Sequence, residues 1–137
     1  YSDEYGKFGC IACPVGFEAE SKGQKQCNNC PSGQYQSEIG KGCHACPMGY
    51  HQVTVASLNC SSCPRGYFQP SEKGSSCLEC NTGYYSKAIG TGEGRTDCSN
   101  CPLGFYSDEN AQLSCEICPA GNVDIVNVHV CLKYFNA

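Results

Sequence analysis

The chain has 137 residues, of which 15 are cysteine, and a formal net charge of −4 at pH 7. Leu, Ile, Val and Phe together make up only about one residue in six, which is too little aliphatic material for a conventional core. Small secreted domains of this kind replace hydrophobic burial with cross-links, and the cysteine content is typical of a disulfide scaffold. The composition therefore excludes a doubly wound α/β enzyme, an α/β barrel and a helical bundle.

Two classes of partner are also excluded. No apolar run approaches the roughly 18 residues that cross a bilayer, so we expect no membrane span in this chain. The nine Lys and Arg residues are scattered, so the sequence has no basic patch for nucleic acid. The sequence starts without Met and without a signal peptide, which indicates a mature chain or a fragment.

The cysteines form seven C-x-x-C pairs in chain order. The pairs fall at positions 10/13, 27/30, 43/46, 60/63, 77/80, 98/101 and 115/118, and Cys131 follows them. The second cysteine of most pairs opens a similar phrase, as in Cys13-Pro14-Val15-Gly16-Phe17 and Cys63-Pro64-Arg65-Gly66-Tyr67. A short polar loop then leads to the next pair. Repetition at this period predicts a linear array of small units.

The repeat divides the chain into eight segments. Residues 1–12 are the C-terminal part of a truncated repeat, 13–29, 30–45, 46–62, 63–79, 80–100 and 101–117 are repeats, and 118–137 are a terminal repeat and tail. The repeat 80–100 carries a four-residue insertion. Because residues 1–4 match residues 106–109, we expect the chain to begin inside a repeat of a longer array.

The local chemistry of the unit predicts turns and short strands. Proline after the cysteine fixes φ and removes an N–H donor, so the chain leaves the cross-link extended. Glycine two residues later permits a turn with positive φ. The aromatic residues that follow, such as Tyr67 and Phe68, are expected to cover a neighbouring disulfide. We therefore expect a small disulfide-rich fold, an elongated linear array of short cysteine-rich repeats with short β-hairpins and turns and little or no helix.

Spacing alone does not fix the disulfide pairing. The simplest scheme joins each loop-opening cysteine to the next loop-closing one. It gives Cys13–Cys27, Cys30–Cys43, Cys46–Cys60, Cys63–Cys77, Cys80–Cys98, Cys101–Cys115 and Cys118–Cys131. This scheme leaves Cys10 over, with a partner expected outside the chain. Each loop of about 14 residues would stabilise the fold by roughly 3 kcal/mol through restriction of the unfolded chain.

C-x-x-C pairs also occur in zinc sites and in redox-active sites. Zinc ribbons hold one metal with four thiolates, but seven pairs give no natural grouping into fours. A thioredoxin-like redox pair needs a single C-x-x-C at a helix start in an α/β fold. His44, His51 and His129 lie in different repeats without paired ligand spacing, which favours solvated or packed imidazoles. We therefore expect cross-links, with no metal, no cofactor and no catalytic residues.

The C-P-x-G-aromatic phrase followed by C-x-x-C resembles the ephrin-receptor-like cysteine-rich repeats of extracellular proteins. It is also similar to the first half-module of tumour necrosis factor receptor cysteine-rich domains. The resemblance covers residues 1–131 and departs from the pattern at Asn81, in place of proline, and at Asn122-Val123, in place of aromatics. It implies an extracellular module of receptors, adhesion proteins and large surface proteins of protists, and it specifies no activity.

Two sequence features suggest contacts outside the repeat core. Asn59-Cys60-Ser61 is an N-glycosylation sequon, so in a secretory compartment we expect an N-linked glycan on Asn59. The stretch 123–130 is the most β-branched in the chain. It is either a short strand packed on the last disulfide loop or an edge strand that pairs with another copy or a partner. The candidate assembly positions are Val123, Ile125, Val128 and Val130.

A stack of small units that touch only their neighbours makes a rod, which suits spacing or adhesion better than catalysis. We therefore expect a non-enzymatic extracellular structural or adhesive repeat protein, secreted or on the cell surface. We expect it to work through protein partners or self-association, assembling into a filament or a surface coat. The alternative is the ligand-binding or stalk segment of a cell-surface receptor ectodomain.

Overall fold

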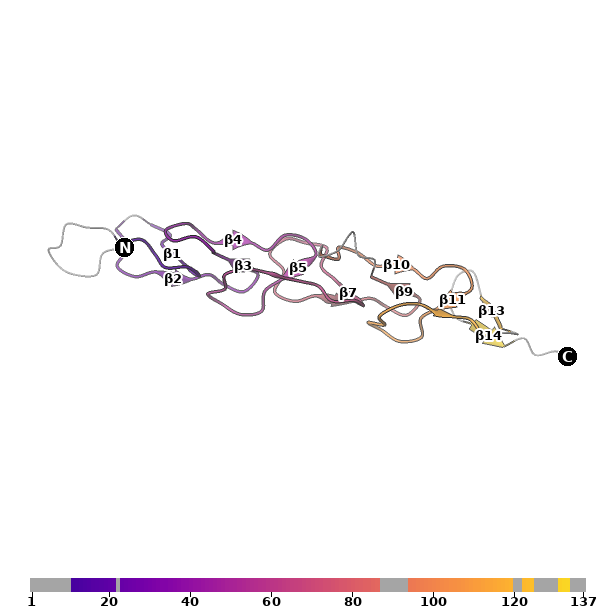
Figure 1. Cartoon of the computed structure of the whole chain (residues 1–137). Helices are drawn as coiled ribbons and strands as arrows, with labels where there is room; N and C mark the ends of the chain where they lie inside the picture. The colour runs from indigo at the N-terminus through magenta and orange to yellow at the C-terminus, as the bar shows by residue number, and fades with distance from the viewer. Residues whose placement is uncertain (1–10, 22, 87–93, 120–121, 125–130, 134–137) are drawn as a thin grey trace.

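The computed structural model describes residues 11–21, 23–86, 94–119, 122–124 and 131–133. These residues form an elongated series of short hairpins that run from one end of the molecule to the other (Figure 1). The described segments contain no helix, and accordingly none that is long and apolar enough to cross a membrane. The fold class expected from the sequence, a linear disulfide-rich array, is confirmed.

In the described segments, seven antiparallel two-stranded hairpins follow one another. The pairs are β1 (Phe17–Glu18) with β2 (Asn28–Asn29), β3 (Gln34–Tyr35) with β4 (His44–Ala45), β5 (Tyr50–His51) with β6 (Ser61–Ser62), β7 (Tyr67–Phe68) with β8 (Leu78–Glu79), β9 (Tyr84–Tyr85) with β10 (Ser99–Asn100), β11 (Phe105–Tyr106) with β12 (Glu116–Ile117), and β13 (Asn122–Asp124) with β14 (Cys131–Lys133). In the first six hairpins the first strand follows a glycine with φ of +78° to +84°. The second strand consists of the two residues between the cysteines of a C-x-x-C pair. The sequence repeat is therefore one hairpin, closed at its base by sulfur.

Seven disulfides close these hairpins. They join Cys13–Cys27, Cys30–Cys43, Cys46–Cys60, Cys63–Cys77, Cys80–Cys98, Cys101–Cys115 and Cys118–Cys131. Each links a loop-opening cysteine to the next loop-closing one, which is the simplest succession given by the sequence. Below, each loop is named by its two cysteines, from loop 13–27 to loop 118–131. Loop 80–98 carries the insertion and has a sequence separation of 18, against 13 or 14 in the others.

Sulfur and polar side chains fill the interior. Among the described residues, every buried apolar side chain is a loop-opening cysteine, and Cys30, Cys46 and Cys63 are fully enclosed. Buried Gln and Ser side chains lie beside them, and Gln36 and Ser107 have no exposed surface. Large apolar residues such as Leu103 and Ile117 are about 70% exposed. Cross-links therefore occupy the place that aliphatic side chains take in a larger domain.

A glutamine directly after the first strand holds the loop in three of the hairpins. Gln69 Nε2 donates to Ser76 O at 2.6 Å, and its Oε1 accepts from Ser71 N at 3.1 Å. Gln52 does the same between Thr54 N and Asn59 O, and Gln36 Nε2 donates to Lys41 O. Backbone groups thus satisfy these side chains, including the buried Gln36 and Gln69, and Gln36 Oε1 accepts from Gly16 N of the preceding loop at 3.0 Å. This repeated glutamine position was not predicted from the sequence.

Backbone hydrogen bonds join each loop to the next one. The carbonyl oxygens of Cys13, Cys30, Cys46 and Cys80 accept at 2.8 to 2.9 Å from the amides of Gly40, Ala56, Lys73 and Ala111, here called the donor residues. All four donor residues have positive φ, between 56° and 75°. At Cys63 the following loop is the long one, and Arg95 Nη1 takes the place of the backbone donor at 2.7 Å. Every buried carbonyl of this set is thereby paired.

The glycines of the C-P-x-G phrase reach one loop further. A Cβ on Gly33 would lie 2.2 Å from Lys73 O, and a Cβ on Gly66 would lie 2.1 Å from Ala111 O. Gly16 and Gly49 approach the backbone of Ala56 and Gly94 in the same way. In each case the contact spans two loops. The expectation that a repeat touches only its immediate neighbours is therefore wrong, because a glycine without Cβ lets the next-but-one loop approach its backbone.

Candidate functional site

In three of the hairpins, the second residue of the first strand lies near the closing cysteine of the next loop. Glu18 Oε2 accepts from Cys43 N at 2.8 Å, and His51 Nδ1 lies 3.2 Å from Cys77 Sγ. Phe68 and Cys98 line a common surface depression. The residues at this position, here called the cover residues, are Glu18, Tyr35, His51, Phe68, Tyr85 and Tyr106. Four of the six are Tyr or Phe.

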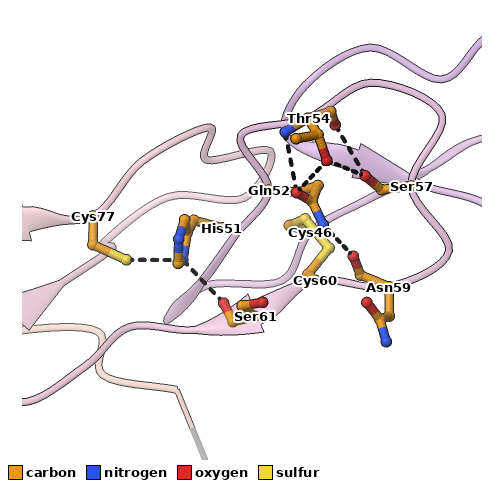
Figure 2. Close-up of a disulfide and its surroundings, with 9 residues drawn as sticks. All are labelled: Cys46, His51, Gln52, Thr54, Ser57, Asn59, Cys60, Ser61 and Cys77. Atoms are coloured by element: carbon orange, nitrogen blue, oxygen red, sulfur yellow. Dashed lines mark hydrogen bonds between the residues drawn. A yellow bond between two sulfur atoms is a disulfide. The ribbon is translucent and has the colours of Figure 1, made fainter.

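His51 differs from the other cover residues in its chemistry. Its Nδ1 atom lies 3.1 Å from Ser61 O and 3.2 Å from Cys77 Sγ (Figure 2). A backbone carbonyl oxygen and a disulfide sulfur can both accept a hydrogen bond, and neither can donate one. Nδ1 must therefore carry the hydrogen. This one hydrogen is shared between Ser61 O and Cys77 Sγ, so the cover position here places an N–H donor beside a disulfide sulfur.

His51, Cys63 and Cys77 form a close group. Their ring nitrogen and sulfur atoms all lie within 4.8 Å of one another, a spacing also found among metal ligands. Cys63 and Cys77 are joined to each other, however, and metals bind the thiolate rather than a disulfide sulfur. In this state the group is an imidazole beside a disulfide. This group was not predicted from the sequence, because His51 lies in loop 46–60 and the two cysteines belong to the different pairs 60/63 and 77/80.

Asn59 lies on the surface beside the Cys46–Cys60 disulfide. It is exposed, and its backbone carbonyl accepts from Gln52 Nε2 at 2.7 Å. Figure 2 shows the Asn59 carboxamide pointing away from Gln52. Loop 46–60 thus uses the main chain of Asn59 and leaves its side chain on the outside.

The other residues singled out in the sequence are placed as follows. His44 is exposed in β4, and its ring centroid lies 5.9 Å from that of Tyr35. Val123 pairs with Leu132 between β13 and β14. Cys10, Ile125, Val128, His129 and Val130 lie outside the described residues. The hairpin of β13 and β14 thus contains one of the four candidate assembly positions.

A tyrosine and a glutamate pair across the hairpin of β11 and β12. Tyr106 OH donates to Glu116 Oε2 at 3.1 Å. This hydrogen bond, together with the negative charge of Glu116, raises the pKa of Tyr106 above its ordinary value. The pair lies at the surface, and the nearby negative charge of Asp108 also contributes to the raised pKa of Tyr106.

The described surface includes two depressions that could be considered as sites. One, of about 340 Å³, is lined by Phe68, Glu79, Asn81, Tyr84 and Cys98. The other, of about 210 Å³, lies beside Cys13 and Lys41. Within the described part of the chain, neither depression contains a nucleophile paired with a base, which hydrolytic or transfer chemistry requires.

Comparison with known families decides what kind of array this is. The family model described as "Tyrosine-protein kinase ephrin type A/B receptor-like" matches three overlapping stretches, residues 16–59, 49–93 and 83–127. The chain belongs to the ephrin-receptor-like family. Each ephrin-receptor-like match begins at a glycine with positive φ, the first residue of a hairpin unit. No curated protein matches the chain.

The ephrin-receptor-like assignment agrees with the disulfide content. Ephrin-receptor-like repeats are a receptor-type, non-enzymatic ectodomain module, and seven disulfides persist only in an oxidising compartment. Together they point to an extracellular location.

Proposed function

We propose that this chain is part of an extracellular structural or adhesive protein that acts as a stiff spacer and assembles into a filament or a surface coat. The observation that supports the proposal is the continuous set of bonds between loops. Four loop-opening cysteine carbonyls accept from a backbone amide of the next loop, and a fifth accepts from Arg95.

Stiffness follows from how far these contacts reach. Gly33 lies in loop 30–43 and packs against Lys73 O in loop 63–77, while Lys73 N donates to Cys46 O in the intervening loop. Bending the array between these loops would break both contacts at once. A chain restrained at each step and at each second step holds two ends apart, which is the work of a spacer rather than of an enclosed active site.

Electron microscopy and sedimentation velocity of the purified chain test the assembly part of the proposal. We expect rods that associate into longer or laterally packed polymers as concentration rises. Monomeric rods at every concentration would contradict assembly while leaving the spacer role in place.

The stretch 123–130 is our proposed assembly strand. A hairpin exposes the outer edges of its two strands, and such edges accept a further strand. We expect the double substitution Val128→Lys and Val130→Lys to reduce polymer formation, since charged edge residues oppose strand addition. The matched control is Val53→Lys with Val55→Lys, at exposed positions in loop 46–60. Equal polymerisation of both variants would contradict the role of the stretch.

The second candidate is a ligand-binding or stalk segment of a receptor ectodomain. The observation in its favour is the receptor-type family to which three stretches of the chain belong. If native protein is released from membranes only by detergent, the result supports the receptor role and contradicts the secreted coat. Release by salt or carbonate washing would support the secreted coat and contradict the receptor role.

We also propose that Asn59 carries an N-linked glycan. The exposed side chain and its outward direction in Figure 2 support this. Material from a secretory host should lose one glycan mass on treatment with peptide N-glycosidase, and Asn59→Gln and Ser61→Ala should both remove it. An unmodified Asn59 in such material would refute the proposal.

A further inference from the structure

The first six disulfides have similar surroundings, with one exception. In each of them the loop-opening cysteine is at most 4% exposed, whereas the loop-closing cysteine is half-buried. Their Cα–Cα distances are 5.6 to 5.8 Å. Access and span therefore do not distinguish one from another. They differ in the side chain that the cover residue places beside the closing cysteine.

His51 brings the hydrogen-bond donor described above to Cys77 Sγ at 3.2 Å. An N–H donor stabilises a thiolate far more than it stabilises a neutral disulfide sulfur, because charge-assisted hydrogen bonds are about twice as strong. The cover residue of the following loop is Phe68, which has no donor, and the cover residue of the first loop is Glu18, whose charge disfavours a thiolate. Of the three disulfides with these neighbours, Cys63–Cys77 thus has the one that best stabilises the reduced form.

We propose that Cys63–Cys77 is a thiol–disulfide exchange site, at which Cys77 accepts an external thiol and His51 stabilises the Cys77 thiolate. The inference is independent of the proposed function. Cys77 is the half-buried partner and Cys63 is fully enclosed, so an incoming thiolate meets Cys77 Sγ first. The ligand class is a small or protein-borne thiol.

The exchange proceeds in two balanced steps. A thiolate attacks Cys77 Sγ, a new S–S bond forms to Cys77, and the electron pair of the Cys63–Cys77 bond goes to Cys63 Sγ, which takes a proton from solvent. A second thiolate attacks the external sulfur of this mixed disulfide and expels Cys77 as a thiolate, to which His51 Nδ1–H donates. Two thiols are oxidised to one disulfide, and Cys63 and Cys77 are reduced.

Opening this disulfide would loosen the array at one place. Loop 63–77 contains Lys73, whose amide donates to Cys46 O and whose carbonyl packs on Gly33. Those two contacts hold three successive loops together. Exchange at Cys77 would therefore release a joint in the middle of the described array while the other disulfides stay closed.

The test is an equilibrium of the intact chain with reduced and oxidised glutathione, followed by alkylation and peptide mass spectrometry. We expect Cys63 and Cys77 to be alkylated at a lower ratio of reduced to oxidised glutathione than the matched pair Cys46–Cys60, by roughly tenfold in equilibrium constant. In His51→Phe, which installs the residue of the matching Phe68 position, this difference should vanish. Mixed disulfides with glutathione should be found on Cys77.

A rescue variant separates this role from a structural one. His51→Asn places an amide N–H near the position of Nδ1 and should restore part of the difference that His51→Phe removes. If His51→Phe does not fold, the wild-type ranking and His51→Asn decide the question. The proposal is overturned if wild-type Cys63–Cys77 is reduced no more readily than Cys46–Cys60, or if folded His51→Phe keeps the wild-type ranking.

Discussion

Loop 63–77 and loop 80–98 solve the same problem in different ways. In loop 63–77, the amide of Lys73 donates to the carbonyl of Cys46 in the loop before it. In loop 80–98, which contains the insertion, a side chain does this work, as Arg95 Nη1 donates to Cys63 O at 2.7 Å. In both cases a hydrogen-bond donor from the next loop reaches the carbonyl of the loop-opening cysteine, although the loop length and the donating residue differ.

The same two loops also differ inside. In loop 63–77, the side chain of Gln69 accepts a hydrogen bond from Ser71 N and donates one to Ser76 O. The matching position in loop 80–98 is Ser86, whose hydroxyl accepts from Gly66 N at 2.7 Å instead. A serine is too short to reach across a loop, so it supports the contact between loops and leaves the loop itself to its disulfide. In these two loops, different side chains order the loop and join it to its neighbour, whereas Gln36 does both, because its Oε1 accepts from Gly16 N and its Nε2 donates to Lys41 O.

The largest expected effect breaks the contact between next-but-one loops. In Gly33→Ala the new Cβ would lie 2.2 Å from Lys73 O, at a backbone φ of +78°. We expect a loss of about 2–5 kcal/mol in the free energy of opening loop 63–77, from the left-handed backbone and the steric conflict together. Hydrogen exchange of the Lys73 amide, which donates to Cys46 O, measures it directly.

Gly23→Ala is the matched control for this substitution. Gly23 has φ of +80° but nothing within 4 Å of an added Cβ. It should show the backbone cost alone, about 1–2 kcal/mol. Equal losses in the two variants would mean that the contact with Lys73 contributes nothing beyond backbone conformation.

The next effect concerns the brace inside loop 63–77. Gln69→Leu removes both hydrogen bonds of a buried amide and leaves Ser71 N and Ser76 O without their partner. We expect a loss of about 1–3 kcal/mol, with faster exchange of the Ser71 amide. Gln26→Leu, at an exposed position, is the control and should change neither quantity. An unaltered Ser71 amide in Gln69→Leu would show that the loop holds itself without the glutamine.

Much of this architecture is readable from the sequence, and the reasons for the failures are physical. The C-P-x-G phrase predicts the turns and short strands, and the structure adds that the two residues between the cysteines of a pair form the return strand. Gln36, Gln52 and Gln69 escaped prediction because a buried glutamine looks like any polar loop residue until its backbone partners are known. The His51 group was missed because contacts between loops depend on how hairpins stack, which sequence period alone does not give.

A smaller effect tests the side-chain substitute in the long loop. Arg95→Leu leaves the enclosed carbonyl of Cys63 without a donor. It also removes Arg95 Nε, which among the described side chains is a buried nitrogen without a hydrogen-bond partner, and this gain offsets part of the loss. We therefore expect a net loss of only about 1 kcal/mol, read from exchange of the Gln69 amide that donates to Arg95 O.

The control for the long loop is Arg65→Leu, which removes an exposed arginine of the C-P-x-G phrase. It should leave exchange of the Gln69 amide unchanged. If Arg95→Leu and Arg65→Leu change exchange of the Gln69 amide equally, the Arg95 guanidinium does not substitute for the missing backbone donor.

The smallest expected effect lies in the surface pair formed by Tyr106 and Glu116. Deprotonating Tyr106 would break its hydrogen bond to Glu116 and bring two negative charges together, which is why the pKa of the phenol is raised. Glu116→Gln should lower that pKa toward its ordinary value, as followed by the ring ¹³C shift of Tyr106 against pH. Glu109→Gln should change it little, because Glu109 is not among the groups that shift it. Neither variant should alter exchange of the Ala111 amide, which donates to Cys80 O, because the array is held by its loop contacts and not by surface pairs on its hairpins.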